Sequence, residues 1–183
     1  QIEEILDMGF QAGELGYDLR LELVEGVRKM VEQKAVKVNS VHNFCPVPLG
    51  AARGHPEIFT MGSTDARERE KAIHHTGNTI RFAAEIGAGV VVTHAGNVDM
   101  KHLTGQLLDL HMEGQQFSKR YEKTKLKLQL KRDKKAPRQV EHLARSLEQL
   151  LPLLQETGVC LAIENLPTWE ALPTEVEIEN LLK

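Results

Sequence analysis

The feature that most constrains the fold is a run of consecutive apolar residues, Val90-Val91-Val92, which lies between Gly89 and Thr93. A strand with one face in water alternates apolar and polar residues. A run without alternation is typical of a strand buried on both faces, as in a parallel sheet. Three other segments are predicted to be extended, and each ends at Gly, Pro or polar residues: 11–17, 36–44 and 159–164. The sequence therefore predicts four strands.

Helical patterns, in which apolar residues recur at spacings of three and four, lie before, between and after these strands. They cover 2–8, 19–34, about 65–86, 139–157 and the segment from Thr174 onward. Thr174 and Glu177 form a capping-box pattern, and Pro152 should kink or interrupt the helix over 139–157. Strands that alternate with helices of this length predict right-handed crossovers and a parallel sheet.

The predicted fold class is therefore α/β, a TIM (β/α) barrel that is incomplete in this chain, with about four strands visible. A barrel needs more strands, so the chain is expected to be a fragment, or the ordered part, of a longer protein. An open doubly wound sheet is the alternative. It is less favoured because no GxGxxG or P-loop pattern follows the first strand. The length suits a single domain, residues 1–183.

One connection is predicted to be much longer than an ordinary loop between a strand and a helix. Residues 98–138 form a basic helical insertion. Between Lys119 and Arg138, ten Lys or Arg residues stand against Glu122 and Asp133, a local net charge of +8. Such a segment is a solvated helix, a lid or dimer arm that supplies charge for a phosphorylated sugar, or a nucleic-acid groove. It lacks interleaved aromatic residues for base stacking, which argues against nucleic acid.

Overall charge and cysteine content narrow the class of protein further. The net charge of −3 gives no strong attraction to nucleic acid or to an anionic membrane. No apolar stretch approaches the length that spans a bilayer, so no membrane partner is expected. Cys45 and Cys160 match no metal-binding spacing, and Cys160, inside an apolar run, is expected to be a buried thiol. This usage fits a cytoplasmic protein.

Polar residues follow three of the predicted strands where each apolar run ends: His42, His94 and Glu164. The carboxyl ends of parallel strands form the ligand-binding edge of α/β folds. Imidazole nitrogens and carboxylate oxygens are standard ligands of divalent ions, and a buried carboxylate at Glu164 would need a cation. A single strand-end histidine is more often structural, but three polar residues at equivalent places predict a metal site.

Three motifs together, VHNFCP, STDARERE…IRFAAEIGAGVVVTHAG and LAIENLP, resemble the sugar isomerase/epimerase superfamily with a xylose-isomerase-like barrel. Endonuclease IV is a member of the same superfamily. The similarity covers roughly residues 40–183 apart from the insertion. It implies that Glu164 is a metal ligand and the catalytic acid–base group, and that His94 and His42 bind metal or contact substrate hydroxyls. It also implies an aspartate, a histidine and a second glutamate from later strands, which would fall after Lys183.

Three further residues are expected to contact the substrate: Glu14 on the first strand, Asn165 beside Glu164, and Trp169 just beyond. Asn165 is equally typical of a turn, and Trp169 of a residue packed on the barrel rim. The activity that the resemblance implies is a metal-dependent sugar or sugar-phosphate isomerase or epimerase, which transfers a proton through an enediolate.

The resemblance implies a divalent ion, Mn, Mg, Co or Zn, as the cofactor. The expected partner is a small sugar or sugar phosphate, and a homo-oligomer is a further expectation. Two alternatives stay open for the function. One is an endonuclease-IV-like zinc phosphodiesterase, and the other is a barrel that only binds a ligand.

Overall fold

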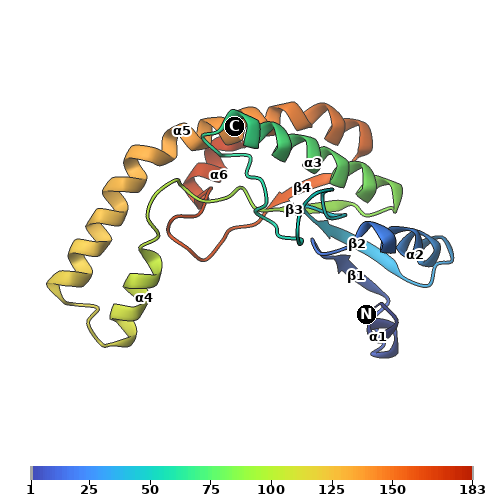
Figure 1. The fold of residues 1–183 in the computed structure, drawn as a ribbon, viewed down its shortest axis with the longest axis horizontal. Coiled ribbons are helices and arrows are strands. Elements are labelled where there is room, and N and C mark those ends of the chain that lie inside the picture. Colours follow the sequence, from blue (N-terminus) through green and yellow to red (C-terminus); the bar gives the residue numbers. More distant parts are fainter. Residues whose placement is uncertain (1, 183) are drawn as a thin grey trace.

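The computed structural model describes residues 2–182, and helices cover one face of its single sheet (Figure 1). The strands are β1 (Ala12–Leu15), β2 (Lys37–His42), β3 (Val90–Thr93) and β4 (Cys160–Ile163). They pair in parallel, in the order β1-β2-β3-β4. The predicted α/β fold class, with four strands of an incomplete barrel, is therefore confirmed.

Helices precede, connect and follow the strands. They are α1 (Ile2–Asp7), α2 (Leu21–Glu32), α3 (Ala66–Glu85), α4 (Thr104–Met112), α5 (Lys119–Thr157) and α6 (Glu175–Leu181). Asp65 caps α3 by accepting a hydrogen bond from the backbone N–H of Arg67. Thr174 and Glu177 form the predicted capping box at the start of α6.

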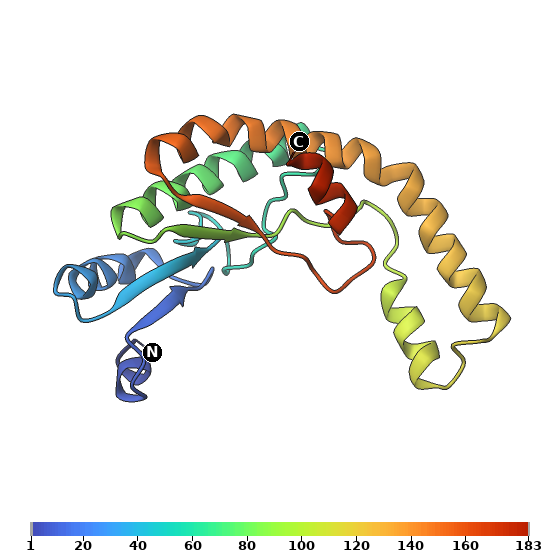
Figure 2. The ribbon, with the colours of Figure 1, turned by 180° about the vertical axis from the view of Figure 1, so that it is seen from behind.

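The core lies between the sheet and the helices α2, α3 and α5 that pack on it, as the view from behind also shows (Figure 2). Val41 of β2 and Val91 of β3 are paired in register, and both are fully buried. Val90 and Val92 are only partly buried, so the predicted burial of this strand on both faces is wrong. The reason is that, within residues 2–182, helices cover only one face of the sheet.

Helix α5 ends at Thr157 as predicted, but its start and its continuity at the prolines differ from the prediction. It begins at Lys119 rather than near residue 139, so the second half of the basic segment and the predicted helix form one element of 39 residues. It also runs through Pro137 and Pro152 without interruption, although it curves along its length (Figure 1). Each proline removes one backbone hydrogen bond. The packing of α5 on α3 and α4 holds the remaining turns in place.

Both cysteines are free thiols, and the prediction that Cys160 is buried is wrong. Cys160 is exposed because β4 lies at the edge of the sheet within residues 2–182. Cys45 is buried, and its burial, together with the nearby charge of Asp18, raises the pKa of the thiol to about 12.

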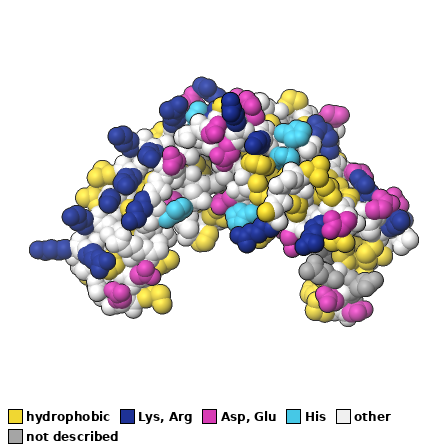
Figure 3. All heavy atoms as spheres, viewed as in Figure 1, with side chains coloured by type: hydrophobic (Ala, Val, Ile, Leu, Met, Phe, Trp, Pro, Cys, Tyr) yellow, Lys and Arg dark blue, Asp and Glu magenta, His cyan; other side chains and the backbone are white. Residues whose placement is uncertain are grey.

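The basic segment forms an arm that extends away from the sheet and consists of α4 and the first half of α5 (Figure 1). Lys and Arg side chains lie along the surface of this arm in Figure 3. Leu126 and Leu130 are more than half exposed among them. The role of the arm as a lid or a dimer contact stays a prediction. None of the helices within residues 2–182 combines the length and the apolar character required to span a membrane.

A buried carboxylate joins this arm to the loop that follows β4. Glu170 is fully buried, and its carboxylate accepts hydrogen bonds from the backbone N–H groups of Leu103 and Thr104 and from the Thr104 hydroxyl. Burial alone raises the pKa of the Glu170 carboxyl, but these hydrogen bonds outweigh it and hold the pKa below its ordinary value. Glu170 is therefore ionised at neutral pH and fixes the start of α4.

We expect Glu170→Gln to lower the free energy of unfolding by about 2 kcal/mol at pH 7, because charge-assisted hydrogen bonds are lost. The pKa of Glu170 is depressed in the folded state, so its contribution is complete above the ordinary glutamate pKa of about 4.3 and disappears as the pH falls through the folded value. Denaturant midpoints across pH measure both effects. Glu148→Gln, at an exposed position of α5, is the control. Equal midpoints for Glu170→Gln and wild type at pH 7 would contradict this assignment.

Candidate metal centre at the strand ends

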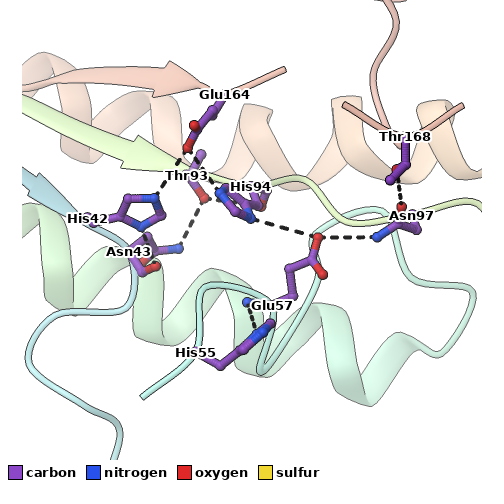
Figure 4. Close-up of polar contacts among 9 residues, drawn as sticks. All are labelled: His42, Asn43, His55, Glu57, Thr93, His94, Asn97, Glu164 and Thr168. Carbon is purple, nitrogen blue, oxygen red and sulfur yellow. Dashed lines mark hydrogen bonds and ion pairs between the residues drawn. The ribbon is translucent and has the colours of Figure 1, made fainter. Parts of the chain in front are cut away.

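Parallel pairing brings the three predicted strand-end residues to one edge of the sheet (Figure 4). His42 is the last residue of β2, His94 directly follows β3, and Glu164 directly follows β4. One nitrogen from each histidine and one oxygen of Glu164 all lie within 4.8 Å of one another. Atoms this close, and of these types, can share a single divalent cation.

The oxygen Oε2 of Glu164 lies at the centre of the group. It is 3.0 Å from Nε2 of His94 and 3.4 Å from Nε2 of His42. The two imidazole rings meet edge to face, with their centroids 5.1 Å apart. Both histidine side chains are mostly buried, at 11% and 14% exposure, whereas the Glu164 side chain is 48% exposed. The expectation that Glu164 is a buried carboxylate is therefore wrong, because β4 is an edge strand within residues 2–182.

Glu164 is nevertheless an anion at neutral pH. Burial alone raises the pKa of its carboxyl, but hydrogen bonds with His94 and then with His42 outweigh this effect and lower the pKa below its ordinary value. The group thus combines one carboxylate with two imidazole rings. This is a common ligand type for zinc and for other divalent ions.

The orientation of the His42 ring favours binding of a cation between His42 and Glu164. Its Nδ1 lies 3.0 Å from the carbonyl oxygen of Asn43, and a carbonyl can only accept, so Nδ1 carries the hydrogen. Nε2 of His42 can then donate to Oε2 of Glu164 only when the ring carries a second proton, and without that proton both atoms are acceptors. Two acceptors in this arrangement need a proton or a cation between them. The residues present therefore fit a divalent ion by both donor type and orientation.

Asn43 holds the backbone next to His42 in place. Its side-chain amide donates hydrogen bonds to the hydroxyls of Thr76 in α3 and Thr93 in β3, at 2.9 and 3.2 Å. Its backbone N–H donates to the carbonyl of Val92 at 2.8 Å. Asn43 is buried, so β2, β3 and α3 are joined by polar contacts directly beneath the site.

The remaining predicted site residues lie elsewhere. Glu14 is exposed on β1, and it accepts a hydrogen bond from the Ser40 hydroxyl of the neighbouring strand at 2.6 Å. Asn165 and Trp169 line a separate hollow, together with Arg132 and the start of α6. The structure thus brings together His42, His94 and Glu164 and leaves the other three predicted residues apart from them.

Three residues near the group were not predicted from the sequence. The ring of Tyr17 meets that of His42 edge to face at 5.3 Å, and it lies 6.3 Å from the ring of His55. Glu57 Oε1 lies 3.8 Å from Nδ1 of His94. Tyr17 follows the end of β1, so the strand-end rule could have identified it. His55 and Glu57 lie in the long loop between β2 and α3, where no periodic pattern marks them.

Comparisons with known proteins agree with this architecture. The family described as xylose isomerase-like TIM barrel matches residues 2–183. No curated protein matches the chain significantly. Among solved structures, the chain is similar to a D-tagatose 3-epimerase-like protein, with a TM-score of 0.64 and 16% identity over 99% of this chain and 54% of the other.

Two other solved structures are similar over 99% of this chain. One is 3-keto-D-glucoside 4-epimerase from E. coli, with a TM-score of 0.64, 14% identity and 56% of its length covered. The other is an L-ribulose 3-epimerase, with a TM-score of 0.62, 15% identity and 50% of its length covered. The chain thus spans about half the length of the solved structures it matches, and at these identities the likeness shows the fold.

We expect Asn43→Ala to lower the free energy of unfolding by about 2 kcal/mol, because the buried hydroxyls of Thr76 and Thr93 lose a hydrogen-bond donor. Asn39→Ala, at an exposed position of β2, the strand that ends just before Asn43, is the matched control. Urea denaturation measures both variants. If the two variants lose the same stability, the assignment of Asn43 as the polar support of the site is wrong.

Proposed function

Since the chain belongs to the xylose isomerase-like TIM barrel family, we propose that it is part of a divalent-metal-dependent sugar or sugar-phosphate isomerase or epimerase. The observation that carries the proposal is the group of donor atoms from His42, His94 and Glu164, all within 4.8 Å of one another at the carboxyl ends of adjacent parallel strands. This is the edge at which barrels of this architecture bind their ligands. The similarity of the fold to sugar epimerases supports the substrate class.

In this proposal, Nε2 of His42, Nε2 of His94 and the carboxylate of Glu164 hold the metal ion. A divalent ion, Mn, Mg, Co or Zn, held there would polarise a carbonyl oxygen and stabilise the negative charge that develops on it. The two histidines would bind the ion with rings that are already held in a fixed orientation. His42 is fixed by the Asn43 carbonyl, and both rings are largely shielded from water by their burial.

The second role of Glu164 is to move a proton. Only Oε2 contacts the two histidines, and Oε1 makes no such contact with residues 2–182. A carboxylate that is half exposed and ionised can remove the proton from the sugar carbon next to the carbonyl. The electron pair of the broken C–H bond then forms a carbon–carbon double bond, and the π pair of the carbonyl moves to its oxygen to give an enediolate. Return of a proton to the neighbouring carbon, or to the other face of the same carbon, completes isomerisation or epimerisation.

Epimerisation also requires an acid–base group on the opposite face of the sugar carbon, and we assign no such group within residues 2–182.

We also propose that Glu14, Asn165 and Trp169 contact the substrate. The side chain of Trp169 is half exposed, and it lines the same hollow near α6 as Asn165. We further propose that the protein is cytoplasmic and that it forms a homo-oligomer. The two free cysteines fit a reducing compartment.

A second candidate function is a zinc phosphodiesterase similar to endonuclease IV. Two of the three donor groups are imidazoles, which suit zinc well, and the basic arm would attract a nucleic-acid backbone. The two functions differ in the metal that is retained. Tightly held zinc, resistant to a chelator, would favour the phosphodiesterase, whereas one exchangeable manganese or magnesium ion would favour the isomerase.

We expect the Mn²⁺-loaded protein to exchange the hydrogen on the carbon next to the carbonyl of a ketopentose or ketohexose for deuterium in D₂O, as followed by ¹H NMR. Glu164→Gln should slow this exchange by about 10² to 10⁴-fold, because the amide cannot accept the proton. Glu148→Gln on the surface of α5 should leave the rate unchanged. Equal rates for Glu164→Gln and wild type would refute the role of Glu164. Cleavage of abasic-site DNA without any exchange would favour the phosphodiesterase instead.

A further inference from the structure

The two histidines of the metal centre differ in what their second ring nitrogen contacts. Nδ1 of His42 has the backbone carbonyl of Asn43 as its partner. Nδ1 of His94 is buried and has no hydrogen-bond partner within residues 2–182. A buried polar atom without a partner is costly, and such atoms are rare in folded proteins. The surroundings of this nitrogen therefore call for a functional explanation.

A carboxylate faces this nitrogen at a short distance. Oε1 of Glu57 lies 3.8 Å from Nδ1 of His94, on the side of the ring opposite Glu164 (Figure 4). The Glu57 side chain is only 24% exposed. A charge-assisted hydrogen bond between these atoms would measure about 2.8 Å, so a shift of about 1 Å closes it.

Glu57 is itself held in this position by two other loops. The side-chain amide of Asn97, just after β3, donates to Oε1 of Glu57 at 3.2 Å. The hydroxyl of Thr168, in the loop after β4, donates to the side-chain carbonyl of Asn97 at 3.3 Å. The backbone N–H of Glu57 also donates to Nδ1 of His55 at 3.0 Å. A continuous row of polar contacts therefore leads from Thr168 to the nitrogen of His94 (Figure 4).

We infer that Glu57 is a positioning residue for the metal centre, which acts by accepting the hydrogen on Nδ1 of His94. A neutral histidine that binds a cation through Nε2 must carry its hydrogen on Nδ1, and in metalloproteins a carboxylate or carbonyl commonly accepts that hydrogen. For His42 the acceptor is a carbonyl, and for His94 it is Glu57. The carboxylate also increases the basicity of Nε2, so it strengthens the bond from His94 to the ion.

This inference rests on the proposed metal centre and adds a residue that does not contact the metal or the substrate. It also gives a role to the loop between β2 and α3, which reaches His94 through Glu57. The carboxylate of Glu57 lies next to His94. Hydrogen bonds from Asn97 to Glu57 and from Thr168 to Asn97 connect this carboxylate to the loops that follow β3 and β4. The loop that carries Glu164 therefore also supports the second ligand.

The test is calorimetric titration of the metal-free protein with Zn²⁺, on wild type, Glu57→Gln and Glu57→Ala. Loss of an outer partner of a histidine ligand typically costs 10 to 100-fold in metal affinity, so we expect Glu57→Ala to lose that factor. Glu57→Gln keeps an acceptor without its charge and should show a smaller loss. Glu70→Gln, an exposed carboxylate in the first half of α3, should bind Zn²⁺ like wild type.

A second readout separates positioning from a merely structural role. In the Zn²⁺-loaded wild type, the Nδ1 hydrogen of His94 should give a downfield ¹H NMR signal that exchanges slowly with water. This signal should be lost in Glu57→Ala and retained in Glu57→Gln, with the melting temperatures of the metal-free variants unchanged. Wild-type Zn²⁺ affinity in Glu57→Ala would overturn this inference alone. Failure of the wild type to bind Zn²⁺ at all would overturn both the metal centre and the inference.

Discussion

Parallel pairing of β2, β3 and β4 is the constraint on which the candidate site depends. The register places Val41 beside Val91 and Val91 beside Leu161, so the three strands end at the same edge of the sheet. A slip of one residue would turn the side chain at each strand end to the opposite face. The buried valines and the polar contacts of Asn43 both oppose such a slip. The core packing and the candidate metal centre therefore both depend on this register.

The candidate site has an excess of negative charge and of hydrogen-bond acceptors at that edge of the sheet, and its proposed chemistry follows from this excess. Glu164 supplies a negative charge, and Nε2 of His42 faces it, while the Asn43 carbonyl accepts the hydrogen on the other ring nitrogen. Glu57 adds a second carboxylate on the far side of His94. Two carboxylates around two histidines favour a cation, and a divalent cation is what the proposed proton transfer requires.

The sequence predicted the four strands, the capping box of α6 and the three strand-end residues, because burial and capping leave clear local patterns. It failed where tertiary context decides. Pro152 is tolerated because α5 is packed along its length, and Cys160 and Glu164 are more exposed than expected because β4 lies at an edge. Glu57 could not be found in this way, since only the folding of a long irregular loop brings it to His94.

The most direct test of this account is anomalous X-ray diffraction from crystals of the protein soaked in Zn²⁺, with data collected on both sides of the zinc absorption edge. If the three residues bind a divalent ion, an anomalous peak should lie about 2 Å from Nε2 of His42, Nε2 of His94 and a carboxylate oxygen of Glu164. A map with no peak among these three residues, at a Zn²⁺ concentration that loads other surface sites, would contradict it.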